Sequence, residues 1–223
     1  MKLRFLTYLF ILFITSSCAG YHFNTNNNPL IGYDIRSISV PMFVNRTVIP
    51  DLSSAVTREI ILTLNNYSGL KVYNGNNSKA DAILIGVLES KDFYKDTVTT
   101  TQKLYTEDTV AGSIGGRTSF YYPSQTTYSY WMNIYIVKNF SQEELDFIAQ
   151  NGFTDQLKFN AKVVLYDRID LSNNFYRVVG ETSAPNSPGK TNFVKNHGIM
   201  IKSLEDTAIN AASTFKQVVL NAF

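Results

Sequence analysis

The stretch "TYSYWMNIYIV", residues 127–137, decides the fold class because two different kinds of side chain alternate along it. Such alternation predicts a β-strand whose successive side chains point to opposite faces of a sheet. The first face would carry the apolar and tyrosine side chains of Tyr128, Tyr130, Met132, Ile134 and Ile136. The second face would carry Trp131, Asn133 and Tyr135.

The stretch "PDLSSAVTREIILTLNN", residues 50–66, predicts a helix. Its apolar residues recur every four positions and form one stripe, composed of Leu52, Val56, Ile60 and Leu64. Asp51 or Ser53 is expected to cap the start of this helix. The asparagine pair 65–66 and the following Ser-Gly dipeptide are expected to end it.

The last 20 residues predict a second helix. Its stripe has alternate spacings of four and three and consists of Leu204, Ala208, Ala211, Phe215, Val218 and Ala222. Ser203 to Asp206 resembles a capping box. A start near Asn192 stays open, with Gly198 as the argument against it.

Further strands are expected around this framework. Ile38 and Val40 alternate with serines before Pro41, residues 70–74 form a short strand, and residues 82–97 form a longer one. The cleanest alternation lies in residues 156–168. There one face would carry Leu157, Phe159, Ala161, Val163 and Leu165, and the other Lys158, Asn160 and Lys162.

Helices with one apolar stripe and strands with one apolar face predict an α+β fold. We expect two helices packed on one face of a four- to five-stranded mixed or antiparallel sheet. Two segments do not fit this plan. Residues 99–126 form a long polar insertion, and residues 141–154 form a short helix that ends at an Asn-Gly pair.

The N-terminal stretch "FLTYLFILFITSSCAGYHF", residues 5–23, holds the single cysteine of the chain, Cys18. The apolar run from Phe5 to Ile14 would span about 15 Å as a helix, half of a hydrocarbon core of about 30 Å. With Lys2 and Arg4 before it, the run predicts a signal peptide over residues 1–17. The junction resembles a bacterial lipobox, in which the cysteine is lipidated. An ordinary signal peptide with an incidental cysteine is the alternative.

This interpretation divides the chain into three parts. A signal peptide occupies residues 1–17, a lipidated Asn-rich tether residues 18–35, and a single domain residues 36–223, with the polar insertion 99–126. The chain has 20 Lys and Arg against 18 Asp and Glu, and loss of Lys2 and Arg4 would balance these charges. A neutral chain without a basic run argues against nucleic acid as a partner.

Three phrases stand in order along the mature chain: "CAGYHF", "ISVPMFVNRTVIPDLSSAVTREIILTL" and "KVYNGNNSKADAILIGVLESKDF". Together they resemble the LPS-assembly lipoprotein family, LptE. The resemblance implies an outer-membrane lipoprotein facing the periplasm, anchored through Cys18. It implies partnership, as a plug, with the LptD β-barrel, binding of lipopolysaccharide, and no catalysis. Ala19 after the cysteine favours the outer membrane in families of this type.

Two groups of residues are candidates for binding. Lys158, Lys162 and Arg168 would meet the phosphates or acidic sugars of lipopolysaccharide; a plain solvated sheet face is the alternative. Arg46, Trp131 and Tyr135 would contact the partner protein. For the last two, ordinary β packing is an equal alternative. In the phrase "VPMFVNRT", the favoured interpretation is structural, with Asn45 and Thr47 stabilising the turn.

Enzymatic function is not expected, nor a cofactor or a metal. His22 and His197 each stand without a second ligand at metal spacing. The run "GSIGGR" lacks the ending of a phosphate loop, and no G-x-S-x-G motif occurs. The alternative function is that of an accessory envelope lipoprotein of the CsgG type, which would assemble with itself or bind a cell-wall synthase.

Overall fold

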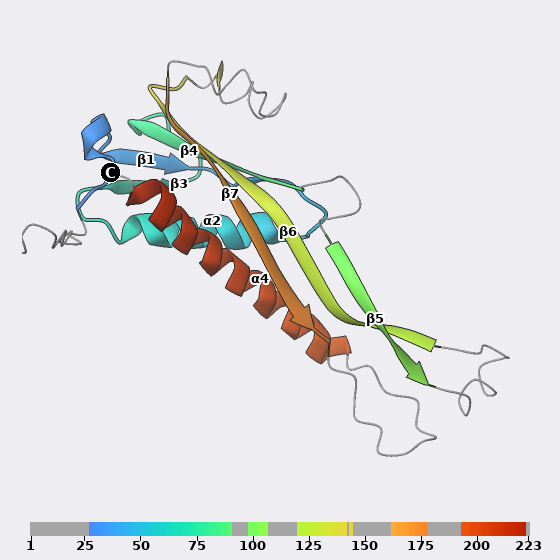
Figure 1. Cartoon of the computed structure of the whole chain (residues 1–223). Coiled ribbons are helices and arrows are strands. Elements are labelled where there is room, and N and C mark those ends of the chain that lie inside the picture. The colour runs from blue at the N-terminus through green and yellow to red at the C-terminus, as the bar shows by residue number, and fades with distance from the viewer. Residues whose placement is uncertain are drawn as a thin grey trace, which may run out of the picture.

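The computed structural model describes residues 27–90, 98–106, 120–141, 143–144, 162–177 and 193–221. The predicted signal peptide, Cys18 and Lys158 lie outside these residues. A sheet and two long helices form two layers (Figure 1). The strands are β1 (Ser37–Val40), β2 (Val44–Arg46), β3 (Lys71–Asn74), β4 (Ala82–Glu89), β5 (Val98–Thr106), β6 (Phe120–Lys138) and β7 (Val163–Tyr176). The helices are α2 (Leu52–Asn65) and α4 (Phe193–Phe215), and the short turns η2 (Ile31–Tyr33) and η5 (Lys216–Leu220) complete the list.

The seven strands form one mixed sheet with the order β3-β1-β4-β6-β5, in which β2 also pairs with β4 and β7 with β6. β1, β2, β3 and β4 pair in parallel, whereas β6 pairs antiparallel with β4, β5 and β7. The expected α+β class is confirmed. The sheet has more strands than expected because Val44–Arg46 forms the short strand β2 and because the polar segment 99–126 contributes most of β5 and extends β6.

Both helices lie on the same face of the sheet (Figure 1). The predicted stripe of α2 is fully buried, with Leu52, Val56, Ile60 and Leu64 all at 0% exposure. The predicted inner face of β6 is buried in the same core, from Tyr128 to Ile136. The periodicities of four and of two were therefore sufficient to orient the helix and the strand that hold the core together.

Neither predicted cap forms as expected. Asp51 precedes α2 in a left-handed conformation, with φ 57°, and its side chain makes no capping hydrogen bond. Ser203 is not at a helix start, because α4 begins ten residues earlier, at Phe193. Its side chain is buried beside the hydroxyl of Tyr128, at 2.8 Å, so it joins helix to sheet instead of capping the helix.

Two local irregularities move side chains away from their predicted faces. The π turn η5 ends the C-terminal helix, and there Val218 is 46% exposed while Val219 is 1% exposed. An extra residue per turn rotates the following side chains, so the predicted stripe shifts by one position. In β7, a register shift lies between the pair Leu165–Ile136 and the pair Val163–Val137. Leu165 therefore packs against the main core, whereas Val163 packs in a smaller cluster on the opposite face of the sheet.

The folded body begins before β1. Asn27 bridges to Ser68, and Asn28, Leu30 and Ile35 are buried. The Asn28 amide donates to the carbonyl of Ile35 and its oxygen accepts from the amide of Leu30. Residues 27–35, which the composition placed in the tether, are thus held by side-chain hydrogen bonds and by apolar contacts with the core.

Candidate functional site

Residues from four strands form a row across the sheet face that points away from α2 and α4. The backbone register pairs Arg46 of β2 with Glu89 of β4, Glu89 with Trp131 of β6, and Trp131 with Asp170 of β7. Residues directly opposite each other in adjacent strands share a face. We call this surface the outer face, comprising Arg46, Glu89, Trp131, Asn133, Tyr135, Tyr166, Arg168 and Asp170.

The Glu89 carboxylate ties two neighbouring strands to β4. Arg46 Nη1 lies 3.3 Å from Glu89 Oε1, and Asn133 donates from Nδ2 to Glu89 Oε2 at 2.8 Å. The side chains of Arg46 and Glu89 remain 39% and 32% exposed. A pair this exposed contributes less than about 1 kcal/mol to stability, so its main effect is to fix both side chains in place.

The Arg168 guanidinium stacks on the indole of Trp131, with Cζ 3.1 Å from the ring centroid. Arg168 stands two residue pairs further along the sheet, opposite Asn133. A guanidinium over an indole is the strongest common cation–π arrangement, worth about 0.5–1 kcal/mol at an exposed site. Two residue types that often dominate protein interfaces therefore stand together, partly or wholly exposed, on the outer face.

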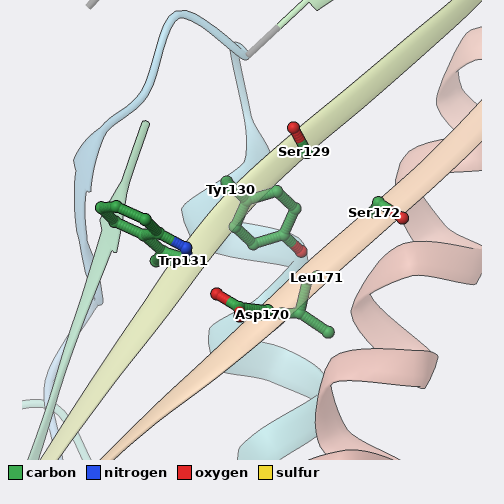
Figure 2. A pocket seen from close by; sticks show the side chains of 6 residues that line it. All are labelled: Ser129, Tyr130, Trp131, Asp170, Leu171 and Ser172. Atoms are coloured by element: carbon green, nitrogen blue, oxygen red, sulfur yellow. The ribbon is translucent and has the colours of Figure 1, made fainter. Parts of the chain in front are cut away.

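A hollow of about 200 Å³ lies beside this stack, between β6 and β7 (Figure 2). Its lining comes from three consecutive cross-strand pairs: Ser129 with Ser172, Tyr130 with Leu171, and Trp131 with Asp170. Tyr130 and Leu171 are core residues whose side chains belong to the helix side of the sheet. The side chains that line the hollow from the outer face are therefore those of Ser129, Trp131, Asp170 and Ser172.

Tyr135 belongs to a second, smaller apolar cluster on the outer face. Its ring lies 4.8 Å from that of Tyr166, with 34° between the ring planes. Ile83, Ile85 and Val137 are buried in the same cluster. At 3% exposure Tyr135 is a packing residue, which is the alternative that the sequence left open for it.

Lys162 is engaged with a carboxylate. Its Nζ lies 2.6 Å from Glu144 Oε1, and this hydrogen bond, with one from the Ser141 amide, lowers the pKa of Glu144 below its ordinary value. Ser141 and Glu144 also bond reciprocally, Glu144 N to Ser141 Oγ and Ser141 N to Glu144 Oε2, as in a capping box. An anionic ligand at Lys162 would have to compete with this carboxylate.

The turn after β2 bears out the structural interpretation of "VPMFVNRT". The Asn45 side chain accepts from the amide of Thr47 and donates to the carbonyl of Ile49. The Thr47 hydroxyl accepts from the amide of Ile49. These short polar side chains replace backbone partners where the chain turns towards α2, as expected for an Asx-type turn.

The structure thus brings Arg46, Trp131, Tyr135 and Arg168 onto one sheet face, while Lys162 stands apart and Lys158 lies outside the described residues. Glu89, Asn133 and Asp170 were not among the predicted site residues. Strand alternation placed Asn133 on the face of Trp131, but only the pairing register brings Glu89 and Asp170 next to it.

Within the described ranges, there is no group of three or more His, Cys, Asp or Glu side chains that could hold a metal ion. None of the helices in that part of the chain has both the length and the apolar character needed to cross a membrane.

No protein-family model matches the chain, and no curated protein matches it. Among solved structures, the chain is similar to rare lipoprotein B from Shewanella oneidensis, with 10% identity over 82% of this chain and 95% of that one, and a TM-score of 0.33. Lipoprotein GNA1162 from Neisseria meningitidis gives 10% identity over 78% and 98%, with a TM-score of 0.32. A Caulobacter crescentus protein, provisionally classed as a lipoprotein, gives 9% identity over 81% and 89%, with a TM-score of 0.39. Likeness this low carries no argument about partner or ligand.

Proposed function

We propose that the chain is a lipoprotein of the outer membrane that acts as a binding partner and carries out no catalysis. Its anchor is a lipidated Cys18 and its body faces the periplasm. Its partner is a β-barrel of the LptD type, and its task is to support lipopolysaccharide assembly. The observation that carries the proposal is the exposed Arg168–Trp131 stack on a sheet face that the helices leave free.

The anchor follows from the N-terminal sequence. A basic start and an apolar run too short to span a bilayer precede Cys18 directly. One acyl chain gives only marginal membrane binding, at about 0.8 kcal/mol per buried methylene, and stable attachment needs more than one. A lipobox cysteine receives several chains, which would hold the domain at the membrane.

The outer face has the composition of an interface centre. Trp, Tyr and Arg are the residue types most often found to dominate binding energies. Arg46 and Glu89 stand at its margin with their charges paired, as is typical of an interface rim. A large protein partner can cover this surface, with the Arg168–Trp131 stack at the middle of the contact.

The lipopolysaccharide part of the proposal rests on three cationic side chains, of which Arg168 lies on the outer face. Arg168 is exposed, and its guanidinium can donate hydrogen bonds to a phosphate from the edge of its plane while it stays stacked on the indole. Lys162 can do so when it leaves Glu144. Lys158 is included on its sequence position alone.

Co-purification tests the proposal. The C-terminally tagged chain, extracted from membranes in detergent, should bring a large outer-membrane β-barrel at equal stoichiometry, identified by mass spectrometry. Cys18→Ala should release the protein from the membrane fraction and remove the mass of the lipid. Trp131→Ala with Arg168→Ala should weaken barrel recovery at least tenfold, as expected for central interface residues.

A matched control is available at the far edge of the sheet. Lys71 lies 4.8 Å from the centre of the Tyr73 ring, another cation–π pair, on β3. Replacing both by alanine removes the same kind of contact at the opposite edge of the same sheet face, away from Trp131 and Arg168, and should leave barrel recovery unchanged. Recovery of rings of the chain itself, or of a cell-wall synthase, with no barrel, would contradict the proposal and favour the CsgG-type alternative.

A further inference from the structure

The hollow between β6 and β7 has the size of a small ligand. At about 30 Å³ per water molecule, 200 Å³ holds roughly six or seven waters, which is close to the volume of one monosaccharide. The Ser129–Ser172 pair leaves the space open because it places two small side chains opposite each other. Trp131 and Asp170 form the next pair and stand as the wall (Figure 2).

The side chains around the hollow match the surface of a sugar ring. An indole offers an apolar surface for the C–H groups of a pyranose. The Asp170 carboxylate can accept hydrogen bonds from two neighbouring hydroxyl groups, and the Ser172 hydroxyl can donate and accept. The hollow therefore offers both an apolar surface and hydroxyl acceptors to an uncharged sugar.

The charges near the hollow favour an uncharged ligand over an anion. Arg46 is paired with Glu89, and on β7 Arg168 is followed two residues later on the same face by Asp170. The lining itself contains one carboxylate and no cation. A phosphate in the hollow would be repelled by Asp170, whereas a hydroxyl group would donate to it.

The indole is also held in advance of binding. Arg168 covers the Trp131 ring but does not line the hollow, so the stack leaves part of the indole available. A side chain already fixed loses less conformational entropy when a ligand binds, which improves affinity without a new contact.

We propose that this hollow binds a single pyranose ring of an uncharged carbohydrate, with Trp131 as the apolar contact and Asp170 as the hydroxyl acceptor. The inference deepens the lipopolysaccharide part of the proposed function and rests on it for the source of the sugar. It assigns to the outer face a ligand group, sugar hydroxyls, distinct from the phosphates expected at the lysines.

The chain contains one tryptophan, so its fluorescence reports this site directly. The full chain, kept in a detergent without a sugar head group, would be titrated with glucose, galactose and N-acetylglucosamine. We expect a saturable change of emission with at least one sugar, in the millimolar range typical of such small ligands. No saturable change with any sugar would overturn the inference.

Variants locate the binding. Asp170→Ala should weaken binding of the responding sugar about tenfold or more, because a hydrogen bond to a charged group is lost. Ser172→Tyr should abolish binding by filling the hollow, and tyrosine is a favourable strand residue. Asn174→Ala, on the same strand and face but outside the lining, should bind as the unmodified chain does.

Unchanged affinity in Asp170→Ala would overturn the inference even if Ser172→Tyr did not fold, since Asp170 is exposed and its replacement leaves the core intact. Barrel co-purification separates this result from the proposed function. A chain that brings the barrel but binds no sugar loses only the sugar site. A chain that binds sugar but brings no barrel loses only the proposed partnership.

Discussion

The ring of Phe43 packs directly against Gly86, in the middle of β4, so closely that a Cβ atom added at Gly86 would overlap the ring. Phe43 is 2% exposed, and its amide donates to the Thr57 hydroxyl of α2 at 3.0 Å. The contact therefore locks the segment before β2 between helix and sheet. Glycine is required at this position by the close approach of the ring.

Gly86→Ala should destabilise the protein by about 1–3 kcal/mol, because the Phe43 ring is buried and cannot move freely away from the added methyl group. Urea unfolding followed by far-UV circular dichroism measures the change. Gly198→Ala is the matched control, since Gly198 lies within α4 with nothing within 4 Å of its added Cβ. That variant should be more stable by about 0.5–1 kcal/mol, and destabilisation of equal size in both would contradict the steric explanation.

A second pair of variants tests the polar contact between β6 and α4. The Tyr128 hydroxyl lies 2.8 Å from the Ser203 carbonyl oxygen and 2.7 Å from Thr207 Oγ1. Asn173 of β7 also donates to both. Tyr128→Phe should cost about 1–3 kcal/mol because buried polar groups lose a partner.

Tyr130→Phe provides the control on the same strand and the same face. The Tyr130 side chain is 1% exposed, and its hydroxyl has no hydrogen-bond partner. Burial raises the pKa of this hydroxyl far above its ordinary value, so it stays neutral. Its removal should leave stability unchanged or increase it, and thermal melting of the two variants side by side would show the difference. Equal losses would mean that Tyr128 acts through packing alone.

These core contacts show which parts of the fold could be predicted from sequence. The stripe of α2 and the alternation of β6 follow from repeat distances, which depend only on local geometry. The exposed Val218 and buried Val219 could not be predicted, because a π turn is decided by packing at the end of α4. The same holds for the separation of Val163 from Leu165 by a register shift.

The outer face could be predicted only in part, for the same reason. Alternation placed Trp131 away from the core, and the residue types of Arg46 and Arg168 marked them as candidates. Their neighbours depend on the register of strands distant in sequence, which brings Glu89 and Asp170 beside Trp131. No local pattern contains that register, so the hollow was not foreseen.

Stability should fall in acid through Asp81. Its Oδ2 accepts from the Ser37 hydroxyl and amide, both at 2.8 Å, and from the Arg36 amide at 3.0 Å. The Ser37 hydroxyl is the largest cause that lowers the pKa of Asp81 below its ordinary value of 3.8. A lowered folded-state pKa stabilises the fold above the unfolded pKa, and this stabilisation is lost as the pH falls from about 4 through the folded value.

Urea unfolding at several pH values below about 5 measures this dependence. Asp81→Asn should be less stable than the unmodified chain at pH 7 and should lose stability less steeply in acid. Ser37→Ala should also reduce the slope, because it removes the largest cause of the shift. An acid slope that is the same in all three proteins would show that other carboxylates govern it.

Lipopolysaccharide binding should depend on the competition between Glu144 and a ligand for Lys162. The two side chains lie 2.6 Å apart and are 34% and 42% exposed, so solvent and ligand can reach both. Glu144→Gln should strengthen binding a few-fold, because it removes the negative charge that competes with an anionic ligand for the ammonium group. Lys158→Glu with Lys162→Glu should weaken binding more than either change alone, since both place negative charge against phosphate.

Surface plasmon resonance on immobilised lipopolysaccharide measures each affinity, with Lys71→Glu at the far edge of the sheet as the control for net charge. Unchanged affinity in the double variant would remove the lysines from the binding surface and leave Arg168 as the cation to test next.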